Sequence, residues 1–215
     1  MGKKYAISGY YGFDNFGDEL ILSLICEKLK QENAAITVFS VSPEETACRY
    51  GVKSSPTFDL LKVIKVLAEA DVLISGGGSL FQDTTSINSL LYYAFVLFTA
   101  QLFGKETIIY RQGVGPLKSP ISRFLVKNLF KKADLVSVRD EKSQKLLESW
   151  GIKSELKDDS AWEIEIPVTE KSDALGVQLR DCAGISDNFL ENLAKAVAKI
   201  NSPEIKLFSL QKKMD

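Results

Sequence analysis

Three glycine-rich segments hold the residues in this sequence that are best suited to bind a ligand. They cover residues 9–19, 76–83 and 112–116, and each places polar or acidic side chains beside its glycines. Glycine lets the backbone approach a ligand closely, and a helix that begins after such a turn offers free N–H groups to an anion. One segment alone would indicate only a tight turn, but three predict a shared cleft. Its candidate binding residues are Gly12, Asn15, Gly17, Gly76, Gly77, Gly78, Ser79, Gln82, Gln112 and Gly113.

The chemistry open to these segments is restricted by what the sequence lacks. The chain has no histidine, and histidine is the commonest acid–base group and the commonest metal ligand in proteins. Any reaction must therefore use carboxylates, arginine, lysine, tyrosine, serine or cysteine. The glycine spacing matches neither the G-x-G-x-x-G nor the G-x-x-x-x-G-K-[ST] signature. No D-x-D pair and no His/Asp cluster is present, so we expect no metal site.

Short apolar runs alternate with amphipathic segments along the first 160 residues. Strands are expected at 5–8, 36–41, 72–75, 107–110 and 135–138, and helices are expected to begin at Asp18, Pro43, Asp59, Ser86, Pro120 and Asp140. This alternation predicts an α/β fold, a Rossmann-like parallel sheet with flanking helices, in which ligands bind beyond the carboxyl ends of the strands. Each glycine-rich segment follows such a strand end. The apolar run 90–103 is too short to span a bilayer and is predicted to be a buried helix.

A polar stretch at 167–173 divides the sequence into two expected domains. The N-terminal Rossmann-like domain is expected over residues 1–166. Residues 174–215 hold one further βαβ pattern, the start of a second Rossmann-like domain. Roughly 40 residues cannot close a core of their own, so we expect the second domain to be incomplete and the chain to be truncated at its C-terminal side.

The composition excludes several classes of protein. The 27 Lys and Arg residues nearly balance the 28 Asp and Glu residues, giving a net charge of −1. Nucleic-acid-binding proteins carry a basic excess or stripe, so no nucleic-acid partner is expected. The three cysteines are far apart and form no disulfide or zinc pattern. With neither a signal peptide nor a transmembrane segment in the sequence, we expect a cytoplasmic protein.

Five motifs in order along the chain resemble the signatures of the polysaccharide pyruvyl transferase family. They lie at residues 7–19, 73–83, 112–116, 138–141 and 176–180, and they are closest to the cell-wall, CsaB-type branch. The resemblance implies a glycosyltransferase-B-like pair of Rossmann-like domains. It implies transfer of pyruvate from phosphoenolpyruvate onto a sugar as a ketal, with no cofactor. In the CsaB-type branch the acceptor is a lipid-linked saccharide, which would place the enzyme at the inner face of the membrane. The second domain of the family also carries an Arg-Leu-His segment that this sequence lacks.

The resemblance also suggests roles for single residues. Phosphoenolpyruvate carries a carboxylate and a phosphate, which guanidinium groups bind well. Arg139 and Arg180 lie in the matching motifs and are the first candidates, with Arg111 as a third; the alternative for each is a surface arginine in a salt bridge. Ketal formation needs acid–base groups, and the carboxylates in the glycine-rich segments are Asp18, Glu19 and Asp83.

Simpler structural roles compete with these assignments. Asp18 and Glu19 open a predicted helix, where acidic residues are favoured by the helix dipole and by capping. We rank the structural role of Asp18 slightly ahead of the catalytic one, whereas a structural role explains Asp83 less easily. Tyr10 and Tyr11 suit either sugar stacking or packing of the loop. Packing is the expected role of the nearby phenylalanines, Phe13, Phe16 and Phe81.

Two further functions are compatible with the same sequence. A nucleotide-sugar glycosyltransferase has the same architecture, and fold alone does not separate it from a pyruvyl transferase. An inactive remnant that at most binds the saccharide acceptor would agree with the absence of histidine. Binding of phosphoenolpyruvate or of a nucleotide sugar discriminates between the two enzyme classes.

Overall fold

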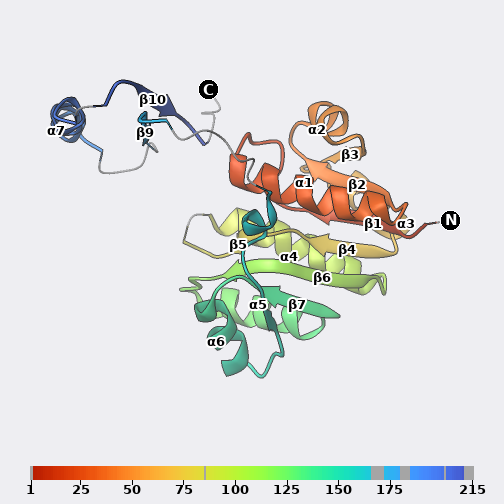
Figure 1. Ribbon diagram of the computed structural model, residues 1–215. Coiled ribbons are helices and arrows are strands. Elements are labelled where there is room, and N and C mark those ends of the chain that lie inside the picture. The colour runs from red at the N-terminus through yellow and green to blue at the C-terminus, as the bar shows by residue number, and fades with distance from the viewer. Residues whose placement is uncertain (1, 85, 166–171, 180–184, 201, 211–215) are drawn as a thin grey trace. The chain divides into compact units, whose positions relative to one another are not determined.

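The computed structural model describes residues 2–84, 86–165, 172–179, 185–200 and 202–210 (Figure 1). The chain divides into two compact units, Met1–Ile164 and Glu165–Asp215. Arg180 and most of the predicted linker at 167–173 lie outside the described residues.

The first unit is built on one parallel sheet, so the predicted α/β fold is confirmed. The strands follow the order β3-β2-β1-β4-β6-β7-β8, and β5 pairs with β6. All of the described pairings are parallel. The strand bounds are β1 Lys4–Ser8, β2 Ala35–Ser40, β3 Lys53–Pro56, β4 Val72–Ser75, β5 Gly78–Phe81, β6 Glu106–Val114, β7 Leu135–Val138 and β8 Glu155–Leu156.

Helices connect these strands and begin at capped ends. The capping residues accept backbone hydrogen bonds and so satisfy donors that a helix leaves free; they include Asp59, Ser86, Ser119 and Asp140. The helix bounds are α1 Phe16–Gln31, α2 Pro43–Tyr50, α3 Leu60–Glu69, α4 Ile87–Leu102, α5 Pro120–Lys131 and α6 Glu141–Ser149, and a short 3₁₀ helix, η1, covers Ser160–Glu163.

The start of α1 differs from the prediction. The sequence suggested that Asp18 opens this helix, but the cap is Asn15, whose side chain accepts hydrogen bonds from the backbone N–H groups of Gly17 and Asp18. Because asparagine and aspartate are equally good caps, the pattern alone favoured the wrong one. The carboxylate of Asp18 is thereby released from capping.

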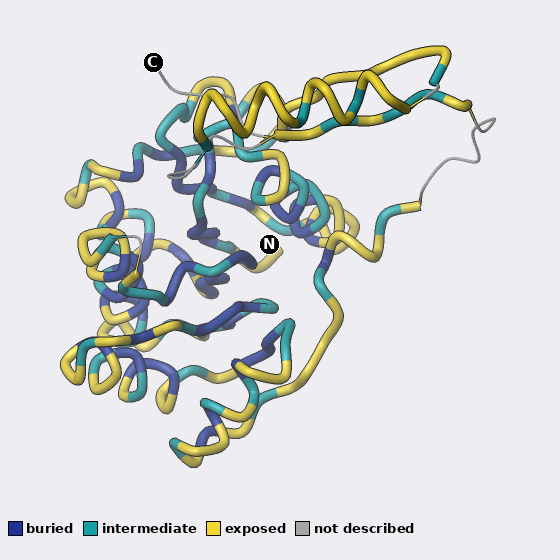
Figure 2. Tube along the Cα trace, turned by 90° about the vertical axis from the view of Figure 1, so that its left-hand side faces the viewer, coloured by how far each residue is buried: buried dark blue, intermediate teal, exposed yellow. Residues whose placement is uncertain are grey.

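Two apolar cores hold the helices on the sheet. One joins the sheet to α3, α4 and α5 through residues such as Val63, Leu97 and Phe130. The other lies under α1 and contains Leu22 and Ile25. Figure 2 shows that the buried residues follow the strands and the inner sides of these helices. Because an apolar core joins the helices to the sheet in each of these two places, the strand ends and the loops that follow them are held in position.

Two segments expected to be loops are strands. Residues 78–81 form β5, and β6 continues through Gln112, Gly113 and Val114. The pairing of β5 with β6 shifts register between Gly78 and Phe81. Glycine and polar residues weaken the strand pattern, so the sequence did not show that the two strands pair.

The apolar helix α4 is only partly buried. Leu90, Leu97 and Ala100 face the core, whereas Phe98 and Leu102 are exposed. The predicted burial of this helix therefore holds for one side only, because apolar residues occupy both sides of α4. None of the helices in the described ranges is long and apolar enough to cross a bilayer.

The second unit contains one βαβ motif. Its parallel strands are β9 Leu175–Gln178 and β10 Ile205–Phe208, joined through helix α7 Asp187–Ala198. None of the residues described in this unit is buried, as the colouring of Figure 2 also shows.

Candidate functional site

A cluster of charged side chains lies at the carboxyl ends of the strands, where parallel sheets bind their ligands. Its centre is Arg139, which directly follows β7. One guanidinium nitrogen, Nη1, donates to Asp159 Oδ2 at 2.8 Å, and Nη2 donates to Ser79 Oγ at 3.0 Å. Ser79 belongs to β5 and Asp159 precedes η1. Three separate segments of the chain therefore converge on one arginine.

Gly113 leaves the space that Arg139 occupies. A Cβ atom at this position would lie 2.7 Å from Ser79 Oγ and 3.3 Å from Arg139 Nε. Both distances are shorter than ordinary van der Waals contacts, so a side chain at 113 would displace the serine–arginine pair. The requirement for glycine here follows from close approach to the Ser79 and Arg139 side chains and not from a turn.

Asp18 faces the same cluster from the first turn of α1. A Cβ atom on Gly78, whose φ is +107°, would lie 2.8 Å from Asp18 Oδ1. Burial raises the pKa of Asp18 to about 6, and nearby Arg139 only partly counters this rise. Within the described ranges, no hydrogen bond to the Asp18 carboxylate is found. Asp18 is therefore a carboxyl group whose pKa lies above the ordinary value, and it does not cap the helix.

A second arginine site lies beside the first. Arg111 has a left-handed backbone, with φ +45°. It donates to the carbonyl oxygen of Asp158 at 3.0 Å and forms an ion pair with Glu163. Glu163 also pairs with Lys28 of α1, and Lys28 and Arg111 together hold the pKa of Glu163 below its usual value. The acidic segment 158–163 thus neutralises both arginines at this edge of the sheet.

Glu19 fastens the first glycine-rich loop. Its carboxylate accepts the backbone N–H of Gly12 at 2.7 Å and the Tyr50 hydroxyl at 2.5 Å. Gly12 has φ +82°, and a Cβ atom there would lie 2.3 Å from Ser40 Oγ. The geometry gives Glu19 and Gly12 a part in holding the loop in place. The catalytic role of Glu19 stays a prediction.

Asp83 is engaged in a similar way at the start of α5. Its two carboxylate oxygens accept the backbone N–H groups of Lys118 and Ser119, both at 2.8 Å. These bonds hold the pKa of Asp83 below its usual value. The neighbouring Gln82 accepts a hydrogen bond from Thr84 at 2.7 Å. The sequence offered no structural explanation for Asp83, and its contacts now supply one, because the partners lie 35 residues away in the chain.

Gln112 ties β6 to the turn between β4 and β5. Its buried side chain accepts the backbone N–H of Leu80 at 3.3 Å and donates to the carbonyl oxygen of Gly76. Gly76 and Gly77 are packed closely as well: Cβ atoms there would lie 1.9 Å from Tyr11 Oη and 3.1 Å from Ile21. Gln112, Gly76 and Gly77 therefore hold the β4–β5 turn in place, whereas Gly78 and Gly113 lie next to the charged side chains of Asp18 and Arg139.

The aromatic residues of the first loop divide between core and surface. Tyr11 is buried, with 1% of its surface exposed, which leaves no face for a sugar. Tyr10 stacks on Phe13 with ring centroids 3.9 Å apart. Phe81 is in the core, but Phe16 is exposed, contrary to the expectation that it packs.

Residues that the sequence reasoning missed include Asp159, Glu163 and Lys28. The available signal was the acidic turn at 158–160, which follows the last short strand and therefore reaches the same edge of the sheet. Arg180 lies outside the described residues. Within the described ranges, no group of three or more His, Cys, Asp or Glu residues is placed so that it could hold a metal ion.

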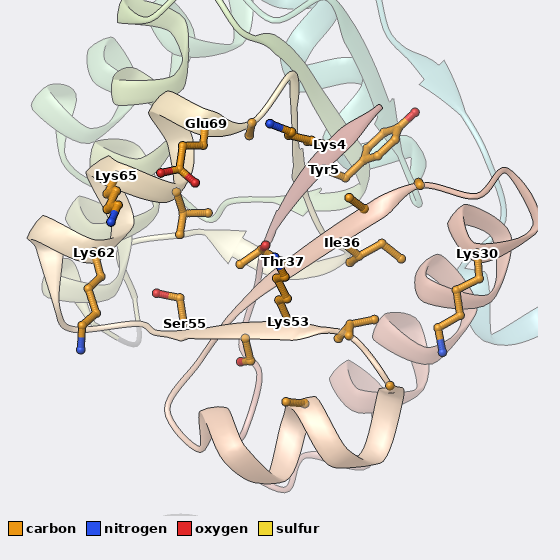
Figure 3. A pocket seen from close by; sticks show the side chains of 18 residues that line it. Lys4, Tyr5, Lys30, Ile36, Thr37, Lys53, Ser55, Lys62, Lys65 and Glu69 are labelled. Carbon is orange, nitrogen blue, oxygen red and sulfur yellow. The ribbon is translucent and has the colours of Figure 1, made fainter. Parts of the chain in front are cut away.

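A cavity of about 820 Å³ lies elsewhere on the first unit (Figure 3). Its lining includes Lys4, Thr37, Lys53 and Lys65, from the amino-terminal parts of β1 to β3 and from α3. None of the predicted site residues lines it. Since the charged cluster and the glycines lie at the opposite ends of the strands, the volume of this cavity does not identify it as the site.

Comparison with known proteins decides the family. The family model described as polysaccharide pyruvyl transferase matches residues 15–213. The chain belongs to the polysaccharide pyruvyl transferase family. This is a family of enzymes, and the sequence resemblance is confirmed at this level. The matched range includes Arg139 and all three carboxylates considered above, Asp18, Glu19 and Asp83.

A solved structure supports the fold. A putative UDP-N-acetylglucosamine 2-epimerase from Listeria monocytogenes matches with a TM-score of 0.54 and 11% identity over 97% of the chain. At this identity the likeness shows a shared α/β fold alone. The chain spans 62% of the length of that protein. No curated protein matches the sequence.

Proposed function

We propose that this chain contributes the phosphoenolpyruvate site of a transferase that forms a pyruvate ketal on a sugar. The family membership supports pyruvyl transfer. The observation that carries the proposal is that the largely buried carboxyl group of Asp18, with its pKa near 6, lies close enough to Arg139 at the carboxyl edge of the sheet to feel its charge. A guanidinium group can bind the anionic groups of phosphoenolpyruvate, and a protonated carboxyl group beside it can donate a proton to the substrate.

Arg139 is the proposed anion partner. A guanidinium group binds a carboxylate or phosphate through two parallel N–H···O bonds. In the structure these donors face Asp159 and Ser79, and an anionic substrate would replace the Asp159 carboxylate. Arg111 is the second proposed partner of the anionic substrate, and its guanidinium group forms an ion pair with Glu163 in the structure. No cofactor enters the proposed reaction.

Asp18 is the proposed proton donor. One sugar hydroxyl adds to C2 of phosphoenolpyruvate while the Asp18 carboxyl group gives its proton to the methylene carbon, which becomes a methyl group. Asp18 then takes the proton of that hydroxyl. A second hydroxyl displaces phosphate from C2, and its proton leaves with the phosphate. An acid with a pKa near the working pH is effective in such a transfer.

The acceptor in this proposal is a sugar with two free hydroxyl groups on a lipid-linked cell-wall saccharide, as in the CsaB-type branch that the motifs resemble. Support for the acceptor comes from that resemblance, while the donor site rests on the contacts of Arg139 and Asp18. The nucleotide-sugar alternative would use the same edge of the sheet with a different donor.

Phosphate release from phosphoenolpyruvate tests this function. With a panel of saccharides that carry paired free hydroxyls, we expect saccharide-dependent release that declines as the pH rises above 6. Asp18→Asn should lower the rate at least 100-fold, as loss of a general acid does, whereas Glu45→Gln on the exposed side of α2 should not. Consumption of UDP-sugar in place of phosphoenolpyruvate would contradict the proposal and favour a glycosyltransferase.

A further inference from the structure

Helix α4 presents an exposed apolar stripe on its outer side. Ile87, Leu91, Phe98 and Leu102 are all exposed, with Leu102 at 68%. Their spacing of 4, 7 and 4 residues places them within about 60° of one another around a helix. The stripe therefore runs the length of α4, about 24 Å at 1.5 Å per residue. Because the opposite side of α4 packs in the core, the stripe is not needed for folding of the first unit.

The two neighbouring helices extend this surface. Helix α4 contacts α3 on one side and α5 on the other. Leu61 in α3 is 80% exposed, and Ile121 and Phe124 in α5 are 79% and 71% exposed. Phe58, just before α3, is exposed and packs edge-on against Tyr92 of α4, with ring centroids 6.2 Å apart. We call this surface the α3–α5 face; it consists of Phe58, Leu61, Ile87, Leu91, Phe98, Leu102, Ile121 and Phe124.

Basic side chains flank the α3–α5 face on both sides, and the excess of positive charge lies on its α5 side. Helix α4 itself carries no charged residue. On the α3 side lie Lys62 and Lys65, both visible in Figure 3; Lys62 pairs with Asp59, and Glu69 stands at the far end of α3. On the α5 side, residues 116–133 contain no acidic residue and five basic ones, Lys118, Arg123, Lys127, Lys131 and Lys132.

We propose that the α3–α5 face docks on the surface of an anionic membrane. Apolar side chains beside a basic surface, here that of α5, are the arrangement with which helices lie in a bilayer interface, where the lysines contact anionic headgroups. Contiguous exposed apolar residues of this number mark interaction surfaces in proteins. A symmetric pair of chains is a poorer occupant, because a two-fold interface would bring the same positively charged surface against itself.

The position of the face fits an enzyme that works at a membrane surface. Leu61, Ile87 and Ile121 all stand in the first turn of their helices. In a parallel sheet, these first turns lie at the carboxyl edge, the same edge as Arg139 and Asp18. Docking would lay the helices along the membrane, with the carboxyl edge at one end of the docked surface. None of the eight residues of the face contributes to the proposed site, so membrane binding stands or falls independently of pyruvyl transfer.

Co-sedimentation with lipid vesicles tests the proposal on the whole chain. We expect binding to vesicles of 30% phosphatidylglycerol in phosphatidylcholine, and at least tenfold weaker binding to phosphatidylcholine alone. Ile121→Ser/Phe124→Ser should weaken binding at least tenfold by removing apolar contacts. Lys127→Glu/Lys131→Glu should do the same by reversing charge. All four positions are at the protein surface, and circular dichroism checks that the variants stay folded.

Two matched variants serve as controls. Lys142→Glu/Lys145→Glu makes the same change in net charge on α6, and Leu156→Ser removes an exposed leucine from β8; both should bind vesicles like the original chain. Equal loss of binding in the controls, or no binding of the original chain to anionic vesicles, would overturn the proposal. A dimer in solution that Ile121→Ser/Phe124→Ser dissociates, without vesicle binding, would assign the face to a second copy instead.

Discussion

At the scale of single residues, the proposed site depends on a carboxyl group kept in a costly environment. Asp18 is largely buried beside Arg139, and burial raises its pKa to about 6 from an ordinary value of 3.8. In the unfolded chain the same group ionises more readily. The protonated form therefore favours the folded state, and this stability is fully present below about pH 4. It is lost as the pH rises through 6.

Asp18→Asn should consequently make the protein more stable at pH 7.5. The shift of the pKa corresponds to about 3 kcal/mol between the two protonation states, so we expect a gain on the order of 1–3 kcal/mol at pH 7.5 and about a third of that gain at pH 4.5, where the carboxyl group of the unfolded chain is already mostly ionised. Urea unfolding at both pH values measures the difference. A variant that is less stable at pH 7.5 would show that Arg139 pairing, and not burial, controls Asp18.

Gly113 is the second prediction at this scale. In Gly113→Ala the new methyl group would press on Ser79 Oγ and Arg139 Nε, so we expect phosphoenolpyruvate to bind at least tenfold more weakly. Calorimetric titration measures the affinity. The double variant Gly113→Ala/Ser79→Ala removes the closer of the two contacts and should recover part of the loss. No recovery would mean that the methyl group acts elsewhere.

At the scale of elements, the support of the site is the hydrogen-bonded joint between β6 and the β4–β5 turn. Gln112→Leu keeps the size of the side chain but leaves the Leu80 N–H and the Gly76 carbonyl without their partner. Two buried polar groups lost in this way cost about 2–4 kcal/mol. Urea unfolding should show this loss, while Gln101→Leu, which removes one bond to Leu129, should cost about half as much. Equal effects would contradict a special role for the joint.

The elements also show how far the sequence could predict the structure. Apolar periodicity identified most strands and helices, because burial against a sheet dictates that pattern. It missed β3 and β5, whose residues are mostly polar or glycine. Gly78 and Gly113 could be placed in a cleft, but their contacts with Asp18 and Arg139 could not be predicted. Those contacts join positions that are 60 and 26 residues apart in the chain, and only the folded sheet brings them together.

At the scale of the whole molecule, the two units differ in how much they bury. The first unit has two apolar cores, whereas none of the described residues of the second is buried. One pair of strands with one helix is marginal without further packing. We expect amide hydrogens of β9 and β10 to exchange at least 100-fold faster than those of β1 and β4. If mass spectrometry instead shows similar protection of these amide hydrogens in both units, the second unit must be packed against another surface in solution.

The central claim is that Arg139 belongs to a phosphoenolpyruvate site. Calorimetric titration of the chain with phosphoenolpyruvate tests it most directly, with UDP-N-acetylglucosamine as the comparison ligand and Arg123→Ala as the control variant. The account predicts selective binding of phosphoenolpyruvate that Arg139→Ala weakens about 10- to 100-fold, the effect of losing charge-assisted hydrogen bonds. Binding that is unchanged in Arg139→Ala, or a preference for the nucleotide sugar, would contradict it.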